Sequence, residues 1–474
     1  MILRIKTLWL VVVAAILVLT LAGCNDTLRQ FITPIPSPGG DPSGLSHAII
    51  VSRNPAINSV PQPGSDLHID VSGDSVAAVV PLGIDPNFIG KSSTRIFALN
   101  SDGTVTSYLA LLPLGASPSI TTLPAGAVGV AGAASPASNF YMANPAQNNL
   151  NVIAPAPIAV TGTIVAGTDP VAVVAGANSG KIYVLNRGSN NITVLSSTDN
   201  ANLGTIQLPA GAGPVWGVLS GDGANLFVVN QGNNTVSVID SLTDTLFATI
   251  ATGSSPNYAF YENRFKRLFV SNTGSNNITI IKADGINANA TPQVLPQKLA
   301  DVAVSGTPTQ VAAISDGTRA YAALGNCPAG INHLTIAASV VGGACAGNLV
   351  SVIDVNALAE RKTIPVGPGA VSIDAAANGS RVYVISAHDA TNVKATVNLP
   401  QPDRSISTPS VSIIDTRTDT VLRSPVDASV TSLVPTFHTP QQVSSCAPTI
   451  DATFNDKVPI PCPGQIPFQV RIFP

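Results

Sequence analysis

Outside the repeated parts of this chain, the residues best able to do chemistry are three histidines in the C-terminal half. His333 lies in one unusually long segment, His388 with Asp389 begins another, and His438 follows further along. Such side chains bind metals or transfer protons only when they converge within a few ångströms. The sequence shows no such convergence, and an isolated loop histidine is more often simply solvated. We therefore take His333, His388 and Asp389 as a candidate binding face and expect no catalytic residues, metal site or cofactor.

The start of the chain has the pattern of an export signal. Arg4 and Lys6 precede an almost wholly apolar stretch, residues 8–21, which is short for a membrane span. The stretch ends in Leu21-Ala22-Gly23-Cys24 and resembles the lipobox of bacterial lipoproteins. The resemblance implies that residues 1–23 are a signal peptide and that Cys24 carries a lipid anchor. The alternative is an ordinary signal peptide with a chance cysteine.

Residues 24–46 are rich in Pro, Gly, Ser and Asp. Such a segment buries too little apolar surface to fold, so we expect a flexible tether between the lipid and the folded domain. Asn25 stands after the cysteine where Asp would mark retention in the inner membrane of proteobacteria. By that resemblance, the expected location is the cell envelope, at the outer membrane or cell surface rather than the inner membrane.

Four further cysteines lie in the C-terminal half of the chain, namely Cys327, Cys345, Cys446 and Cys462. An even number of cysteines in an exported chain indicates disulfides. Three pairings are possible, and the spacing favours the local one, in which Cys327 pairs with Cys345 and Cys446 with Cys462. No Cys-x-x-Cys or Cys/His spacing points to a metal site.

The composition favours β-structure and argues against nucleic acid as a partner. Only 10% of the 474 residues are charged, the formal net charge is −3, and the chain has 39 Gly and 38 Pro. Abundant Gly, Pro, Asn, Ser, Thr and Val suit short strands joined by tight turns. No run of Lys and Arg forms a basic patch of the kind that binds phosphate backbones.

A short strand recurs seven times, as an aromatic residue between apolar residues, usually ending in Asn. The copies are Arg95–Asn100, Asn139–Asn144, Lys181–Asn186, Asn225–Asn230, Arg267–Asn272, Arg319–Leu324 and Arg381–Ser386. Successive copies are 44, 42, 44, 42, 52 and 62 residues apart. A period of about 40 to 50 residues with several short strands per unit predicts a β-propeller with one blade per unit. We therefore predict an all-β propeller of four-stranded blades.

The chain ends are predicted to supply one more blade. Ala48–Ser52, His68–Asp70 and Asp74–Leu82 align with the second, third and fourth strands of the repeat. The first strand of that blade must then come from beyond residue 427. Copy counting favours eight blades with one composite closing blade, with seven as the alternative. We assign residues 47–440 to the propeller and residues 441–474 to a C-terminal closing segment with an expected disulfide.

The repeat resembles the YVTN-family β-propellers of bacterial and archaeal surface proteins. The resemblance rests on Phe227-Val228-Val229-Asn230 followed by Val236-Ser237-Val238-Ile239-Asp240, and it covers about residues 66–425. The family includes structural, binding and lactonase-like members, so the resemblance implies the fold and leaves the activity open. Leu324 and Ser386 depart from the expected Asn in the last two full blades.

Two long insertions, residues 325–348 and 387–409, are the main non-repetitive features and the best place for a site. Motifs for nucleophile elbows, zinc proteases, phosphate loops and haem attachment are absent from the sequence. The leading hypothesis is a non-catalytic, lipid-anchored propeller that binds or scaffolds a protein or polysaccharide partner in the envelope. The alternative is a lactonase-like hydrolase in the central channel, against which we note that the inner strands offer almost no Arg, Lys or His near the axis.

Overall fold

A computed structural model describes the chain from residue 47 to residue 473, with internal gaps. The gaps are residues 58–59, 72–74, 93, 111–117, 135–138, 177–179, 288–290, 292, 337–338, 340–343, 388–409, 422–432 and 436–465. Several predicted features therefore lie outside the described residues: the signal, Cys24 and the tether to residue 46, as well as His388, Asp389, His438, Cys446 and Cys462. Within the described residues, no helix is long and apolar enough to cross a membrane.

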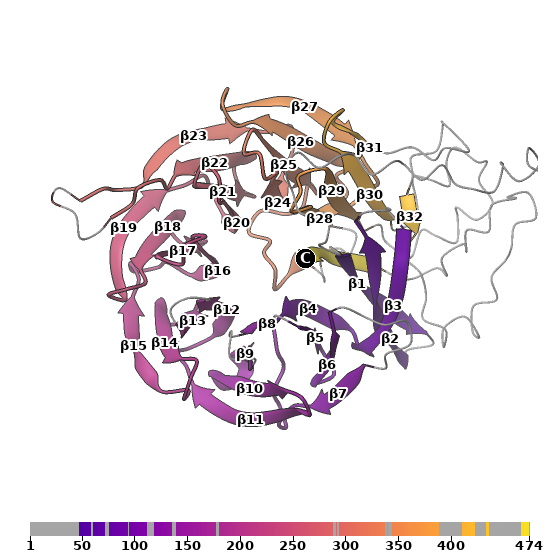
Figure 1. The fold of residues 1–474 in the computed structure, drawn as a ribbon, viewed down its shortest axis with the longest axis vertical. Helices are drawn as coiled ribbons and strands as arrows, with labels where there is room; N and C mark the ends of the chain where they lie inside the picture. Colours follow the sequence, from indigo (N-terminus) through magenta and orange to yellow (C-terminus); the bar gives the residue numbers. More distant parts are fainter. Residues whose placement is uncertain are drawn as a thin grey trace, which may run out of the picture.

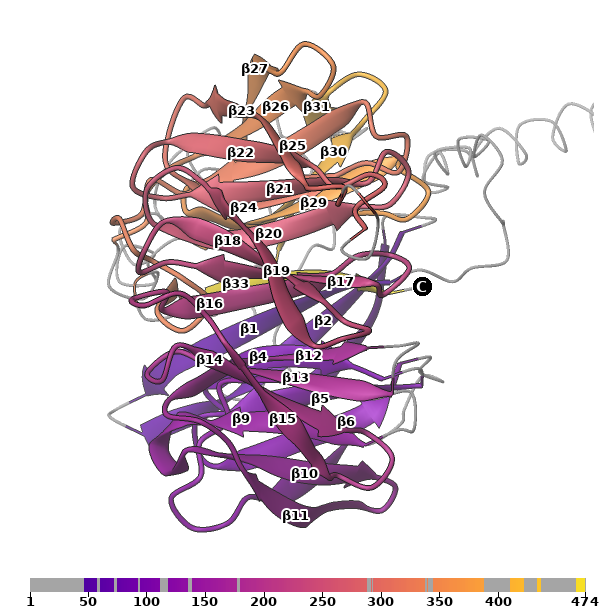
Figure 2. The ribbon, with the colours of Figure 1, turned by 90° about the vertical axis from the view of Figure 1, so that its left-hand side faces the viewer.

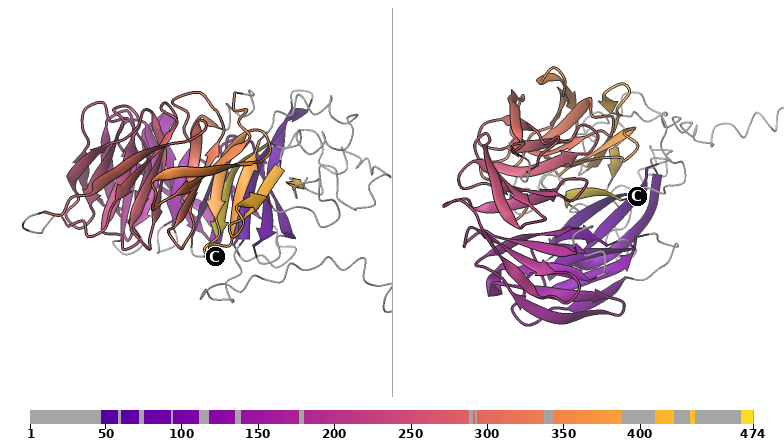
Figure 3. Two further views of the ribbon diagram at one scale, coloured as in Figure 1. Left: turned by 90° about the horizontal axis from the view of Figure 1, so that it is seen from above. Right: turned by 60° about the vertical axis from the view of Figure 1, so that its left-hand side comes forward.

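Eight antiparallel sheets stand around one axis like the blades of a propeller (Figure 1). Each blade has four strands in simple up-and-down order, and β32 (Leu433–Pro435) adds a short pairing to one of them. The side views show the strands crossing the thickness of the ring (Figure 2 and Figure 3). The prediction of an all-β propeller with eight blades is thus confirmed, and the seven-bladed alternative is wrong.

Every blade is built from the axis outward. In this order the composite blade contains β33 (Ile466–Phe473), β1 (His47–Ile57), β2 (Val60–Asp70) and β3 (Ser75–Ile84). The next three blades contain β4 (Pro86–Lys91), β5 (Arg95–Asn100), β6 (Thr104–Leu109) and β7 (Ser119–Thr122); β8 (Ala131–Ala134), β9 (Phe140–Asn144), β10 (Asn149–Pro155) and β11 (Ile158–Val165); and β12 (Pro170–Gly176), β13 (Lys181–Asn186), β14 (Asn191–Ser196) and β15 (Asn202–Gln207).

The last four blades follow in the same direction around the ring. They contain β16 (Pro214–Leu219), β17 (Asn225–Asn230), β18 (Thr235–Asp240) and β19 (Thr245–Ala251); β20 (Pro256–Glu262), β21 (Arg267–Asn272), β22 (Asn277–Lys282) and β23 (Gln297–Ala303); β24 (Pro308–Ala313), β25 (Arg319–Leu324), β26 (Leu349–Asp354) and β27 (Ala359–Pro365); and β28 (Ala370–Ala375), β29 (Arg381–Ser386), β30 (Ser410–Asp415) and β31 (Thr420–Val421). A 3-10 turn, η1 (Pro145–Gln147), joins β9 to β10.

The repeated aromatic strand is the second strand of each of the seven regular blades. Both faces of this strand pack against neighbouring blades, which explains why it reads as a continuous apolar run. Its aromatic residues are fully buried, and they are Phe97, Tyr141, Tyr183, Phe227, Phe269, Tyr321 and Tyr383. Burying such a side chain stabilises the fold by roughly 1.5–3 kcal/mol. The repeat is therefore the packing unit between blades.

Where the residue at this position is tyrosine, its hydroxyl also forms hydrogen bonds with the next blade. The Tyr183 hydroxyl donates to Asp244 Oδ1 at 3.1 Å, and Lys181, two residues earlier, forms an ion pair of 2.7 Å with the same carboxylate. Tyr321 and Arg319 bind Asp419 in the same way, at 2.5 Å and 2.6 Å. The acidic residue lies in the turn between the third and fourth strands, so these contacts tie the turn of one blade to the core of its neighbour.

The ring is closed by the C-terminal strand. β33 pairs antiparallel with β1, so the two ends of the described chain share one blade. Side chains of the neighbouring inner strand β28 accept hydrogen bonds from its backbone, with Val470 N donating to Ser372 Oγ at 3.1 Å and Ile472 N donating to Asp374 Oδ2 at 2.9 Å. On its other side, Gln469 Oε1 accepts from Ile89 N at 3.2 Å. The predicted composite blade is confirmed, and it closes the ring of described blades on itself.

Candidate functional site at the mouth of the central channel

The first long insertion enters the middle of the ring. It connects β25 to β26, and Figure 1 shows it extending from that blade toward the axis. We call residues 325–348 the channel loop. The loop contains no Asp, Glu, Lys or Arg, so any surface that it presents is uncharged.

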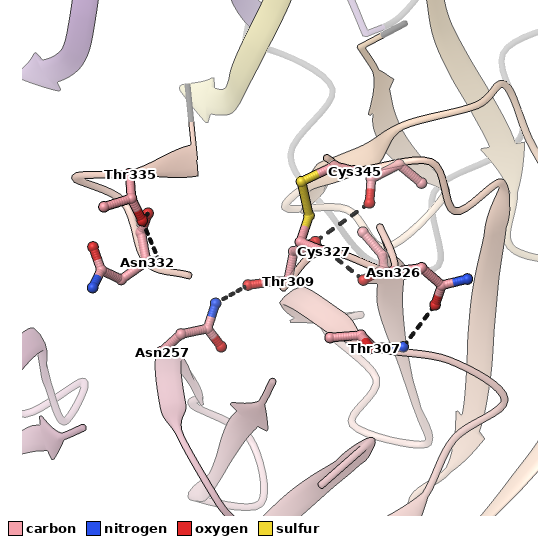
Figure 4. The surroundings of a disulfide bond; sticks show 10 residues. Asn257, Thr307, Thr309, Asn326, Cys327, Asn332, Thr335 and Cys345 are labelled. Carbon is pink, nitrogen blue, oxygen red and sulfur yellow. Dashed lines mark hydrogen bonds between the residues drawn. A yellow bond between two sulfur atoms is a disulfide. The ribbon is translucent and has the colours of Figure 1, made fainter. Parts of the chain in front are cut away.

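A disulfide holds the base of the channel loop. Cys327 and Cys345 are bonded and buried, which confirms this half of the predicted local pairing (Figure 4). Next to them, Gly347 N donates to Gly325 O at 2.8 Å, and Thr307 N donates to Asn326 Oδ1 at 2.8 Å. Closing a loop of this length stabilises the fold by about 3 kcal/mol when the stabilisation is attributed to chain entropy. The loop is thus anchored at both of its ends.

The tip of the channel loop reaches three other blades. Gly330 N donates to Thr273 Oγ1 at 3.0 Å, and Asn332 Nδ2 donates to Gln231 Oε1 at 2.9 Å. These partners directly follow β21 and β17, at the hairpin tips of their blades. His333, the third contact, reaches the inner strand β12. The loop therefore spans one mouth of the channel and is held at both sides of it.

His333 is neutral, and one of its ring nitrogens has no partner among the described residues. Its Nε2 lies 2.9 Å from the carbonyl oxygen of Val171, which only accepts, so Nε2 carries the proton. Burial, together with the charges of Arg471 and Arg187, lowers the pKa of His333 to about 4 against the raising effect of the hydrogen bond to Val171. Nδ1 is then a buried acceptor without a hydrogen bond to the described residues.

Arg471 of β33 lies beneath the loop in an aromatic cluster. Its guanidinium carbon is 5.4 Å from the ring centre of Trp216 and 5.8 Å from that of Tyr258. Arg471 Nη1 donates to Tyr258 Oη at 3.0 Å, and the His333 ring meets Trp216 edge-on at 5.4 Å. Cation–π contacts of this kind are worth roughly 0.5–2 kcal/mol. These contacts fix the orientation of the Arg471 side chain, which lines the channel cavities.

A small cavity of about 20 Å³ separates the channel loop from this cluster. Amide side chains line it together with His333 and Arg471, and they are Asn87, Asn257, Gln310, Asn332 and Gln469. This space holds roughly one water molecule. Within the described residues, no group of three or more His, Cys, Asp or Glu side chains is placed to hold a metal ion. The channel loop thus covers this mouth and leaves only a small polar space beneath it.

The structure corrects one expectation about the channel. Arg471 of β33, Lys91 of β4 and His333 of the loop all line it, although the sequence led us to expect almost no such groups near the axis. A signal for Arg471 is present, since it stands alone between Val470 and Ile472 in an apolar strand. It is missed because the register of the closing strand does not follow from the repeat.

Comparisons with known proteins support the propeller fold and do not identify a function. No family model matches the chain, and no curated protein matches it. Among solved structures, the dihydro-heme d1 dehydrogenase NirN in complex with DHE is similar with a TM-score of 0.59 at 13% identity, over 82% of this chain and 75% of that one. The periplasmic gluconolactonase PpgL of Pseudomonas aeruginosa is similar with a TM-score of 0.48 at 16% identity, over 68% of this chain and 98% of that one.

A putative 6-phosphogluconolactonase from Bacteroides fragilis is similar with a TM-score of 0.49 at 13% identity, over 69% of this chain and 98% of that one. The likeness to NirN, at 13% identity, reports shared architecture alone, and propellers host many unrelated activities. The chain is an eight-bladed β-propeller protein.

Proposed function

We propose that this protein is a non-catalytic binding module of the cell envelope, anchored by a lipid at Cys24. Its channel loop would hold a protein partner or an extracellular polymer. One observation carries the proposal: the loop is pinned by the disulfide and tied to blades across the channel. A surface held in this way loses little conformational freedom on binding, which favours affinity.

The uncharged character of the loop indicates the kind of contact. Its exposed residues include Pro328, Ala329 and Thr335, which offer apolar and hydroxyl groups. Contacts of this kind are insensitive to salt, unlike contacts between charged patches. We therefore expect capture of the partner to persist at high ionic strength.

A capture experiment with matched substitutions tests this proposal. Ala329→Arg and Thr335→Arg place charge on the exposed loop surface, whereas Thr243→Arg places the same charge in a turn at the opposite end of a blade. The full-length protein is used to capture components of its own envelope fraction. We expect the loop variants to lose at least about 90% of a component that the wild type and Thr243→Arg retain. Equal capture by all four proteins would rule out the loop as the binding surface.

The hydrolase alternative gains one supporting observation, the cations Arg471 and Lys91 beside the channel. However, among the described residues that line the channel cavities, the only histidine is His333, and the cavities have no lining carboxylate. His333 is neutral and uses Nε2 to bind a backbone carbonyl. A lactone hydrolysis assay with and without divalent metals separates the two proposals, and metal-dependent turnover would replace binding as the function.

A further inference from the structure

A second and larger cavity occupies the half of the channel away from the channel loop. Its volume is about 360 Å³, within the usual range for small-ligand sites. Residues near the C-terminal ends of inner strands line it, including Lys91 of β4, Ala134 of β8 and Ala175 of β12. Trp216 and Arg471 line it as well, and Arg471 lines the small cavity too. Arg471 therefore stands between the two spaces.

The cavity exists because one side of the ring has small inner-strand residues. β8 is only Ala-Gly-Ala-Ala, and Ala172 to Ala175 of β12 contribute two alanines and two valines. A larger residue at Gly90 or Gly217 would require its neighbours to shift, since a Cβ would lie 2.6 Å from the Phe140 ring and 2.9 Å from a Val174 methyl. Trp216 of β16 lines the cavity as well, whereas Tyr258 lines only the small cavity. The cavity thus has mostly apolar walls, and Trp216 and Arg471 of the aromatic cluster also line it.

The Arg471 guanidinium has a positive charge that the described residues do not fully neutralise. Its hydrogen bond goes to the Tyr258 hydroxyl, and no described carboxylate lies within ion-pair distance of it. Asp374 acts on it through its charge but accepts a hydrogen bond from Ile472 N. A guanidinium has five N–H donors in a fork that matches a carboxylate. Donors therefore remain for a ligand in the cavity.

Lys91 adds a second cation to the same cavity. It ends β4, and its side chain is partly buried, which lowers its pKa from the usual value. A site with two cations and apolar walls favours a ligand that is anionic at its ends and apolar in between.

We propose that this cavity binds a small carboxylic acid with an apolar body. Its carboxylate is bound by Arg471, and its hydrocarbon part lies against the alanines and valines of β8 and β12. Lys91 attracts a second anionic group, so a dicarboxylate binds more tightly than a monocarboxylate. No residue of the channel loop lines this cavity, so the proposal does not depend on whether the loop captures a partner.

Three six-carbon probes test the proposal on the full chain. Hexanoate has one carboxylate, adipate has two, and hexanamide has the same body without a charge. Trp216 stacks under Arg471, so its fluorescence reports ligand arrival. We expect saturable quenching by hexanoate, at least tenfold tighter quenching by adipate, and none by hexanamide. Equal binding of hexanamide and hexanoate, quenching by inorganic phosphate as tight as that by adipate, or the absence of saturable quenching would each overturn the proposal.

Substitutions test the role of each of the two cations in binding. Arg471→Lys keeps the charge but loses the two parallel donors of the guanidinium, and we expect it to weaken the binding of both hexanoate and adipate at least tenfold. Lys91→Met should weaken the binding of adipate at least tenfold and that of hexanoate less than threefold. Because Lys91 is the last residue of β4, we expect no effect on ring closure. Lys282→Met removes the same charge from an exposed position at the end of β22 and serves as the control. Equal effects of Lys91→Met and Lys282→Met on adipate would contradict the assignment of Lys91.

Discussion

At the scale of single residues, the most unusual group lies between the composite blade and its neighbour. Asp66, His68 and Tyr108 are all buried. Tyr108 Oη donates to Asp66 Oδ2, and His68 Nε2 lies 3.2 Å from the same hydroxyl oxygen. Burial raises the pKa of Asp66 to about 7, against the lowering effect of the Tyr108 hydrogen bond. Burial lowers the pKa of His68 to about 3, and the charge of His47 adds to this effect.

These shifts act on stability in opposite directions. The contribution of Asp66 is present below its unfolded pKa of 3.8 and is lost as the pH rises through about 7. The contribution of His68 is present above its unfolded pKa of 6.5 and is lost as the pH falls through about 3. Between about pH 4 and 6.5 each group changes the free energy of unfolding by about 1.4 kcal/mol per pH unit. Their slopes have opposite signs, so we expect this pair to add little to the pH dependence of the free energy of unfolding of the wild type.

Substitution of one partner should reveal the slope of the other. For Asp66→Asn we expect the free energy of unfolding, relative to wild type, to rise by up to about 1.4 kcal/mol per pH unit from pH 4 to 6.5. His68→Gln should give the opposite slope. Urea denaturation at pH 4.5, 5.5 and 6.5 measures both. Parallel pH profiles for the wild type and the two variants would show that these groups are not shifted.

At the scale of elements, the Asn that ends the second strand fastens a hairpin. Asn230 is buried, and its Nδ2 donates to Thr235 Oγ1 at 3.0 Å and to Ser237 Oγ at 2.8 Å. Asn186 and Asn272 bind their third strands in the same way. The short turn between these strands is therefore held by a side chain as well as by the strand ladder.

Removal of one such side chain should lower the stability of the protein. We expect Asn230→Ala to lower the free energy of unfolding by about 1–3 kcal/mol, because two hydroxyl groups lose a buried partner. Asn356→Ala, in an exposed turn after β26, is the control and should change it by less than about 0.5 kcal/mol. Thermal and urea unfolding of both variants measure the difference, and equal values would show that the hairpin does not depend on this Asn.

This element also shows what the sequence could predict. The period and its aromatic strand predict the blades, since both follow from local strand and turn chemistry. Leu324 and Ser386 lack the Asn, and the loop after Leu324 is the channel loop. In the blade of Leu324, the missing Asn thus coincides with an excursion in place of the short hairpin. Where that excursion goes depends on contacts with distant residues such as Gln231 and Val171, which no local pattern encodes.

At the scale of the whole molecule, β33 closes the ring, and we expect stability to depend on it. Val470 is fully buried, and it belongs to one apolar cluster with Ile50 of β1 and Val371 of β28. Alignment of the repeat copies predicts that a closing strand exists. It leaves the register open, and the register decides that Arg471 enters the channel. The candidate ligand site was for that reason not predictable from the sequence.

Deletion of residues 466–474 should open the ring. We expect a lower melting temperature and a broader transition, since the inner edge of β1 and one face of β28 are exposed. A peptide of residues 463–474 supplied separately should restore the wild-type transition, and a scrambled peptide of the same composition should not. Differential scanning calorimetry measures the transitions. An unchanged melting temperature after the deletion would show that β33 is dispensable.

The composite blade also has a consequence for how the protein folds. Its closing pair joins the two ends of the described chain, which is the largest sequence separation that a contact in this ring has. Contacts of such high contact order form slowly, so the open ring should be a long-lived folding intermediate. In that intermediate the edge of β1 is free to accept β33 from a second molecule. Domain swapping of the terminal strand is therefore the misassembly to which this architecture is most exposed.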